Sequence, residues 1–238
     1  MPPDDLRDHA VVPHDRWIAA RKTLLAKEKD FTRARDELNR LRRALPWERV
    51  EKTYVFEGPE GKQTLPQLFA GKSQLFVYHF MFAPERQEGC PHCSFWADHY
   101  DGAGLHLPHR DVSFVVVSRA SLPAIERVKR RMGWRFKWVS SGGSDFNYDF
   151  GVSFTPEQVE PGAAVYNYGA NPGMPDREGA SVFYQDRTGA VFHTYSCYAR
   201  GIDMLNTTYH VLDLMPKGRD EDPDDPQSWV RYHDRYQD

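Results

Sequence analysis

Apolar side chains recur every seven positions through the first part of the chain, between residues 14 and 45. The repeating positions are Trp17, Leu24, Phe31, Leu38 and Leu45. This spacing places them in one stripe on a long helix or a broken helical pair, which Pro46 ends. The stripe either packs on its own domain or joins two chains as the seam of a homodimer, because a one-sided helix needs a partner surface.

Beyond residue 53 the pattern changes to short strands and turns. Tyr54–Phe56 and Lys62–Thr64 flank Gly58-Pro59-Glu60-Gly61, which predicts a β-hairpin. Leu65–Phe69 follows as one helical turn closed by Gly71.

Three apolar runs predict strands, and the first two are expected to be buried on both faces. They are Gln74–Phe82, Val112–Ser118 and Phe136–Ser140. A helix beginning near residue 90 separates the first two runs, and a helix over Pro123–Met132, stopped by Gly133, separates the last two. This alternation predicts parallel pairing with right-handed crossovers.

The rest of the chain completes a mixed sheet flanked by helices. Residues 155–180, rich in Gly, Pro and Asn, form a long surface excursion, and Ser181–Gln185 with Ala190–Tyr195 form a hairpin. Gly201–Leu214 is a terminal helix, and the acidic, Pro-containing segment from Lys217 is expected to be poorly ordered. We therefore expect a helical arm over residues 1–45, an α/β domain over 46–215 and a tail over 216–238.

Composition narrows the class of protein. A content of 40% hydrophobic residues excludes a disordered chain, and a net charge of −3 gives no reason to expect nucleic acid. The N-terminus lacks the apolar segment of a secretory signal, and no apolar run is long enough to span a membrane. Three cysteines in 238 residues fit a reducing compartment, so we expect a cytoplasmic protein.

The candidate chemistry lies in Cys90-Pro91-His92-Cys93, between a predicted buried strand and the start of a helix. Helix N-termini carry free N–H groups and a partial positive charge, which stabilise a thiolate and make a reactive sulfur. Cys90, nearer the helix start, is the expected nucleophile, and Cys93 is the expected resolving thiol. The leading hypothesis is thiol–disulfide exchange on a protein or small-molecule disulfide.

A metal site is the rival hypothesis. Thiolates and imidazole suit zinc or copper(I), so Cys90 and Cys93 could bind either metal together with His193 or His79. His193 and Cys197 fall on one predicted strand, about 13 Å apart, which is too far to share an ion. Cys197 is therefore expected to be a small core residue. A third hypothesis is a non-catalytic interaction module.

The order of strand, Gly turn, Leu-rich turn, buried strand, loop, Cys and helix resembles the peroxiredoxin-like branch of the thioredoxin superfamily. Longer matches resemble the bacterial family catalogued as domain of unknown function 899, over about residues 14–219. The matching segments are Val77-Tyr78-His79-Phe80-Met81-Phe82, Cys90-Pro91-His92-Cys93-Ser94, Met132-Gly133-Trp134, Asp145-Phe146-Asn147-Tyr148-Asp149 and Phe192-His193-Thr194-Tyr195-Ser196. The resemblance implies a thioredoxin-like fold and brings no settled reaction.

Three details bear on what the resemblance implies. Pro91-His92 matches the dipeptide of the bacterial periplasmic disulfide oxidase, which implies that His92 stabilises the Cys90 thiolate. Peroxiredoxins place Thr or Ser three residues before the peroxidatic Cys, where this chain has Gln87. Thioredoxins place a cis-Pro before the strand that faces the dithiol, and the matching segment here begins at Gly179 without one.

Overall fold

The computed structural model describes residues 9–160, 164–169 and 171–237, so the ends of the predicted arm and tail and parts of the 155–180 excursion lie outside it. The chain divides into two compact units, Met1–Pro46 and Trp47–Asp238. In the first unit, the predicted helix is confirmed as α1 (His14–Arg43). Taken by itself, this helix contains no buried residue, and whether its apolar stripe joins two chains stays a prediction.

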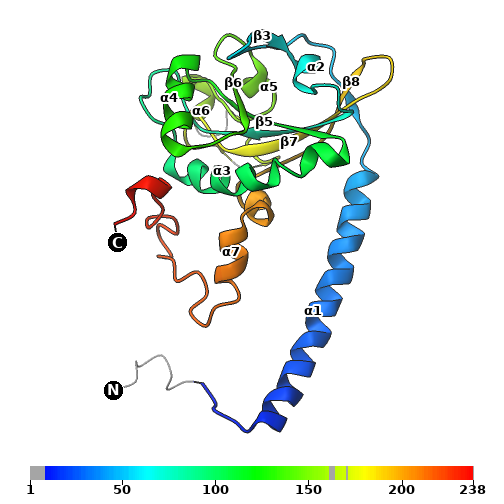
Figure 1. Cartoon of the computed structure of the whole chain (residues 1–238), viewed down its shortest axis with the longest axis vertical. Coiled ribbons are helices and arrows are strands. Elements are labelled where there is room, and N and C mark those ends of the chain that lie inside the picture. The colour runs from blue at the N-terminus through cyan, green and yellow to red at the C-terminus, as the bar shows by residue number, and fades with distance from the viewer. Residues whose placement is uncertain (1–8, 161–163, 170, 238) are drawn as a thin grey trace. The chain divides into compact units, whose positions relative to one another are not determined.

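The second unit is built on one eight-stranded sheet, in the order β1-β8-β7-β4-β5-β6-β2-β3. Its central strands are the predicted apolar runs, β4 (Gln74–His79), β5 (Val112–Ser118) and β6 (Lys137–Ser140). β4 pairs parallel with β5, and β5 pairs parallel with β6, as the alternation of strands and helices predicts. In Figure 1, α3 runs below β5 and β7.

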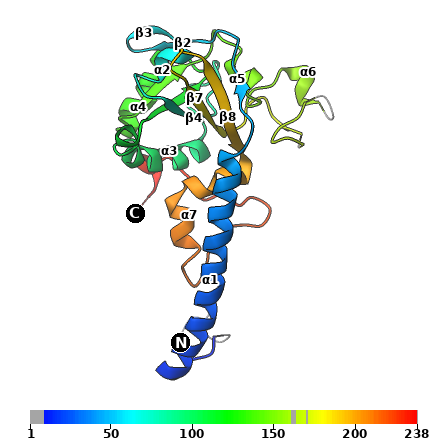
Figure 2. The same cartoon turned by 90° about the vertical axis from the view of Figure 1, so that its right-hand side faces the viewer.

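Antiparallel strands extend the sheet on both sides. The predicted hairpin of β7 (Gly179–Gln185) and β8 (Val191–Tyr198) pairs with β4 through β7, and β1 (Glu48–Arg49) adds to β8. Figure 2 shows β7 and β8 beside β4. At the other edge, the hairpin of β2 (Val55–Gly58) and β3 (Gly61–Thr64) is confirmed, and β2 pairs with β6.

Side chains alternate between the two faces of the sheet, and each face has its own core. Phe80 and Tyr78 belong to the core that includes α3 (Pro91–Ala103) and α4 (Leu122–Met132). Leu75 and Val77 belong to the core that includes α2 (Leu65–Leu68) and α5 (Phe146–Asp149). Successive residues of a strand point to opposite faces, so a residue's position along β4 decides which core it joins.

Two predictions for the C-terminal part are wrong. The helix expected over Gly201–Leu214 is a 3₁₀ helix, η3 (Ala199–Leu205), followed by a short α-helix, α7 (Thr207–Leu212). Asn206 separates them because it is extended and its side-chain oxygen accepts a hydrogen bond from the Tyr209 N–H. An Asn cap of this kind begins a new helix rather than continuing the old one.

The tail is also better packed than its composition predicts. Val230 and Tyr232 are 1% and 3% exposed and join the core around α3. His233, the first residue of the short helix η4 (His233–Arg235), places its Nδ1 2.7 Å from Asp98 Oδ1 on α3. In Figure 1 the red C-terminal segment lies below the left-hand end of α3.

Two short helices remain, the 3₁₀ helix η2 (Leu107–Arg110) and the α-helix α6 (Pro156–Val159). Among the described residues, no helix has the length and apolarity needed to cross a membrane. The α/β class and the mixed sheet flanked by helices agree with the sequence-based prediction.

The docked tail makes a testable contribution to stability. Val230→Asp places a carboxylate in an apolar core, and we expect it to lower the free energy of unfolding by about 3 kcal/mol. The melting temperature should fall by about 6–12 °C for a unit of this size. Val211→Asp is the matched control, because Val211 on α7 is 49% exposed and should change the melting temperature little. Equal melting temperatures for the two variants in a calorimetric scan would show that the tail is not docked.

Candidate functional site

The loop between β4 and α3 brings the dithiol to the end of the central strand. The Cys90 N–H donates to the Met81 carbonyl at 2.9 Å, which folds the loop back beside the strand. Gly89 is required here, because a Cβ at this position would lie 2.4 Å from the Phe80 ring. Pro91 follows as the first helical residue, where its missing N–H costs no hydrogen bond. Cys90 is thus the N-cap residue of α3, as predicted.

Cys93 lies one turn into α3 and is buried, with 2% of its surface exposed. The Met81 N–H lies 3.4 Å from its sulfur. Tyr78, on the face of β4 that packs against α3, places its hydroxyl 3.5 Å from the Cys93 carbonyl oxygen. The two cysteines therefore differ in environment, because Cys90 is half-buried and lines a cavity while Cys93 sits at its floor.

The electrostatics of the pair follow from this difference. The Cys93 thiol hydrogen-bonds to the Cys90 sulfur and holds the pKa of Cys90 well below its ordinary value, and His92 adds to the effect. Burial raises the pKa of the Cys93 thiol well above its ordinary value. The Cys90 sulfur in turn raises the pKa of His92. The arrangement favours a Cys90 thiolate beside an imidazolium, with Cys93 as a neutral thiol.

Sequence reasoning missed Glu178, which lines the cavity together with both cysteines. Its negative charge contributes to the raised pKa of Cys93, and its carboxylate accepts a hydrogen bond from the Tyr166 hydroxyl at 3.2 Å. Glu178 directly precedes Gly179, the first residue of β7, which is the place compared with the thioredoxin cis-Pro. All peptide bonds between described residues are trans. The signal in the sequence that could have identified Glu178 is its position, as an acidic residue directly before the strand compared with the one that faces the dithiol in thioredoxins.

The predicted metal site of Cys90, Cys93 and His193 or His79 is not formed, because both histidines lie away from the sulfurs. His79 continues the series Leu75 and Val77 on β4, and its ring lies 5.6 Å from that of Phe146 in the core opposite α3. His193 contacts Phe183 in that same core. Within the described parts of the chain, no group of three His, Cys, Asp or Glu side chains is placed to hold a metal ion.

The two histidines belong instead to a polar network on their own side of the sheet. His79 Nε2 lies 2.8 Å from the Ser181 hydroxyl, which lies 2.8 Å from the Ser196 hydroxyl, and His193 Nε2 lies 2.7 Å from Ser196. Burial lowers the pKa of His79 to about 3, and burial also lowers the pKa of His193. Both rings are therefore neutral at physiological pH.

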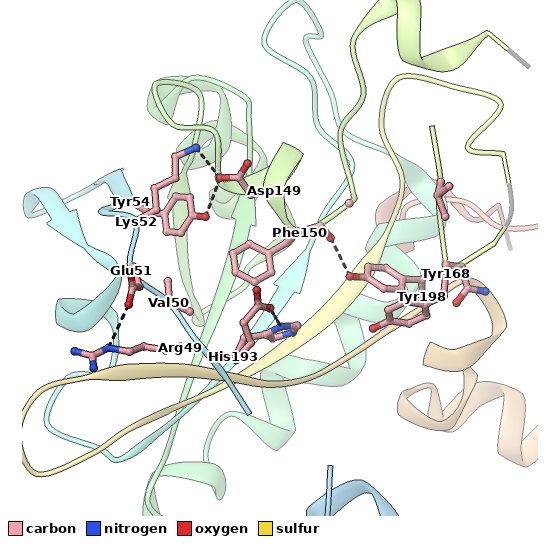
Figure 3. Close-up of a pocket in the computed structure, with 14 residues that line it drawn as sticks. Arg49, Val50, Glu51, Lys52, Tyr54, Asp149, Phe150, Tyr168, His193 and Tyr198 are labelled. Atoms are coloured by element: carbon pink, nitrogen blue, oxygen red, sulfur yellow. Dashed lines mark hydrogen bonds and ion pairs between the residues drawn. The ribbon is translucent and has the colours of Figure 1, made fainter. Parts of the chain in front are cut away.

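A second cavity, of about 440 Å³, opens beside His193 and is separate from the dithiol. Figure 3 shows His193 next to Phe150, and across the cavity the Tyr198 hydroxyl donates to the Phe150 carbonyl at 2.9 Å. Lys52 and Tyr54 both contact the Asp149 carboxylate, at 2.7 and 2.8 Å. Cys197, on the other face, is a small core residue as predicted.

The fold and the dithiol together define a thioredoxin-like protein: a Cys at the start of a helix that follows the central parallel strand, with an antiparallel hairpin beside that strand. The family model described as "Bacterial protein of unknown function (DUF899)" matches residues 6–236, and the chain belongs to this family. No curated protein gives a significant sequence match.

Solved structures with a similar fold include two peroxiredoxins. Peroxidoxin BcpB from Mycobacterium tuberculosis is 13% identical, with a TM-score of 0.45, over 69% of this chain and 96% of that one. Peroxiredoxin Q from Xanthomonas campestris is 14% identical, with a TM-score of 0.46, over 68% of this chain and 91% of that one.

Alkylation tests the assignment of roles to the dithiol. Brief exposure of the reduced protein to iodoacetamide at neutral pH should label Cys90 before Cys93 and Cys197, as peptide mapping would report. In His92→Ala the loss of the imidazolium should raise the pKa of Cys90. Labelling at pH 6 should then slow several-fold, while labelling at pH 10 should not change. His106→Ala, an exposed histidine outside the site, is the control. Faster labelling of Cys197 than of Cys90 would refute the assignment.

Proposed function

We propose that this protein is a thiol–disulfide oxidoreductase that uses the Cys90–Cys93 dithiol. The observation that carries the proposal is the placement of two thiols in one cavity, the half-buried Cys90 at the N-cap of α3 and the buried Cys93 one turn later, and their pKa shifts in opposite directions agree with it. Thiol–disulfide exchange needs one sulfur that is a thiolate in the resting state and a second that attacks later. The half-buried Cys90 and the buried Cys93 meet these two needs.

The reaction proceeds in two exchange steps. The Cys90 thiolate attacks one sulfur of the substrate disulfide, so that a Cys90–substrate bond forms, the substrate S–S bond breaks and one thiolate leaves to take a proton from water. Cys93 then attacks the Cys90 sulfur, which releases the second substrate thiol and leaves a Cys90–Cys93 disulfide. Two electrons pass from the protein to the substrate, and a dithiol reductant restores the reduced form.

Glu178 is the residue proposed to accept the proton of Cys93 in the second step. A buried thiol with a raised pKa must be deprotonated before it can attack, because the thiolate is the nucleophile. Glu178 lines the same cavity as both sulfurs and is half-buried, so its carboxylate is available there. Its role is that of a general base that acts on Cys93.

Mass spectrometry tests the dithiol chemistry. Oxidation of the wild type with a disulfide should lower the intact mass by about two hydrogens, which reports an internal Cys90–Cys93 bond. Cys93→Ser should instead accumulate a mixed disulfide on Cys90, and Cys90→Ser should do neither. If Cys90 accumulates only as the sulfinic acid after peroxide treatment, with no internal disulfide, a one-Cys peroxidase explains the site better.

Glu178→Gln separates the two steps of the reaction. The first step should keep its rate, because Cys90 is already a thiolate. Resolution of the mixed disulfide should slow by about 10–100-fold at neutral pH and recover as the pH rises, since hydroxide replaces the missing base. Rapid-quench mass spectrometry measures both steps. Glu60→Gln, an exposed acid in the turn between β2 and β3 and outside the cavity, is the control. Equal resolution rates in Glu178→Gln and wild type would remove Glu178 from the mechanism.

A further inference from the structure

The dithiol lies in a partly enclosed cavity of about 750 Å³, where Cys90 is half-buried and Cys93 is buried. Its walls come from segments that are far apart in the sequence. Met174 and Glu178 precede β7, Asp203 and Tyr209 belong to η3 and α7, and Gln227 belongs to the tail. We call the tail residues 219–227 that line the cavity the rim.

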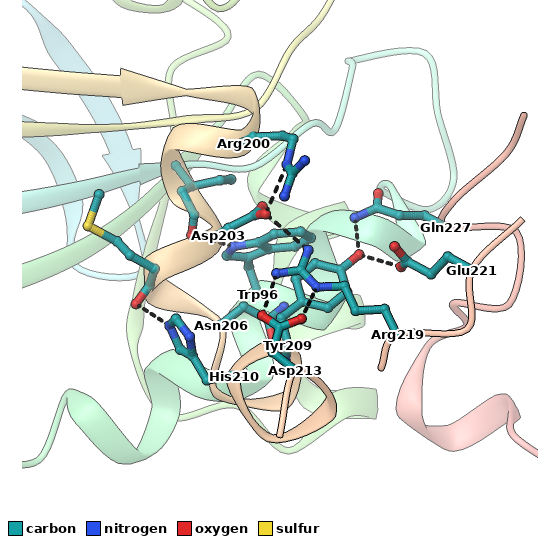
Figure 4. A network of polar contacts seen from close by, with 12 residues as sticks. Trp96, Arg200, Asp203, Asn206, Tyr209, His210, Asp213, Arg219, Glu221 and Gln227 are labelled. Atoms are coloured by element: carbon teal, nitrogen blue, oxygen red, sulfur yellow. Dashed lines mark hydrogen bonds and ion pairs between the residues drawn. The ribbon is translucent and has the colours of Figure 1, made fainter. Parts of the chain in front are cut away.

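The rim is fixed to the rest of the unit by ion pairs. The Arg219 guanidinium lies 3.1 Å from Asp203 and 2.8 Å from Asp213, at the two ends of the η3–α7 segment. It also stacks on the Tyr209 ring, at 3.9 Å from the ring centre. The Arg219 side chain is only 20% exposed, so these contacts are partly shielded from water. Figure 4 shows Arg219 against Tyr209 and between these carboxylates.

Hydrogen bonds fix the other end of the rim. The Tyr209 hydroxyl donates to Glu221 at 2.9 Å and accepts from the Gln227 side-chain amide at 2.9 Å. The Trp229 indole donates to the same Glu221 carboxylate at 3.2 Å. The backbone of Gln227 also hydrogen-bonds to His92, next to the nucleophile. The rim is therefore a wall of the cavity that is held in place by contacts within the chain (Figure 4).

From this enclosure we infer that the substrate is a low-molecular-weight disulfide and not a disulfide on a folded protein. The inference rests on the proposed function and narrows its substrate. A cavity of this volume is in the range that encloses small ligands. A protein disulfide must instead approach with the surrounding surface of its own chain, which the rim obstructs. The lining carries both signs of charge, with Arg177 and Arg200 alongside Glu178 and Asp225, so a zwitterionic disulfide is the suitable probe.

The test compares glutathione disulfide with insulin in single-turnover oxidation of the reduced, full-length protein. Intact mass reports formation of the Cys90–Cys93 disulfide. Each rate is divided by the rate at which dithiothreitol reduces the same disulfide. This normalisation removes the difference in intrinsic reactivity between the two disulfides. We expect the normalised rate with glutathione disulfide to exceed that with insulin by at least about tenfold. Equal normalised rates, or a preference for insulin, would overturn the inference and leave the proposed function standing. No oxidation by either substrate would refute the proposed function itself.

Two variants test the role of the enclosure. Arg219→Met removes the ion pairs of the rim but keeps the length of the side chain, and it should raise the normalised rate with insulin several-fold. Arg187→Met, in the exposed turn between β7 and β8, is the matched control and should leave both rates unchanged. Met174→Trp narrows the cavity at a position that is 40% exposed and outside the core. This substitution should slow oxidation of the dithiol by glutathione disulfide, while the rate of alkylation of Cys90 by iodoacetamide stays the same. An unchanged ratio of the two normalised rates in Arg219→Met and in Met174→Trp would overturn the inference that the cavity walls select the substrate.

Discussion

The backbone of Met81 contacts both cysteines, and the chemistry of the site depends on this double contact. Its carbonyl accepts the Cys90 N–H at 2.9 Å, and its N–H lies 3.4 Å from the Cys93 sulfur. The end of β4 thereby fixes the first turn of α3, with one sulfur facing the cavity and the other at its floor. The Cys93 thiol donates to the Cys90 sulfur and lowers the pKa of Cys90, while burial raises the pKa of Cys93. The difference in their pKa values is thus a consequence of strand–helix packing.

The two-residue repeat of β4 separates the histidines from the dithiol. Phe80 and Tyr78 face α3, so His79 must face the opposite core, where it meets Ser181 and Phe146. This separation follows from the sequence once the register of the strand is known. The metal hypothesis is not supported, because it placed His79 and His193 by the strand and the hairpin that carry them and gave no weight to the face of the sheet that each side chain occupies.

Much of the fold could be predicted because its central elements carry strong local signals. The parallel strands are continuous apolar runs, and α4 ends at a glycine, Gly133, with a left-handed conformation. The dithiol was visible because its motif fits within one turn of helix. Glu178 could not be found in this way, since an isolated acid between a loop and a strand has no periodicity. The docking of the tail was also hidden, because Val230 and Tyr232 are two buried residues in a segment whose average composition is polar.

The same tail supports both the dithiol loop and the cavity wall. The Tyr232 hydroxyl donates to the Gly89 carbonyl at 2.8 Å, directly before the nucleophile, and the Arg235 guanidinium binds the Glu88 carboxylate. Burying Val230 and Tyr232 contributes about 1.5–3 kcal/mol for each side chain, which offsets part of the entropy cost of ordering the segment. Because these anchors lie beyond the rim in sequence, the rim is held at both ends, by Arg219 and by the buried pair. Access to the dithiol and the geometry of its loop are therefore coupled through one docked segment, so that loosening the tail would affect both.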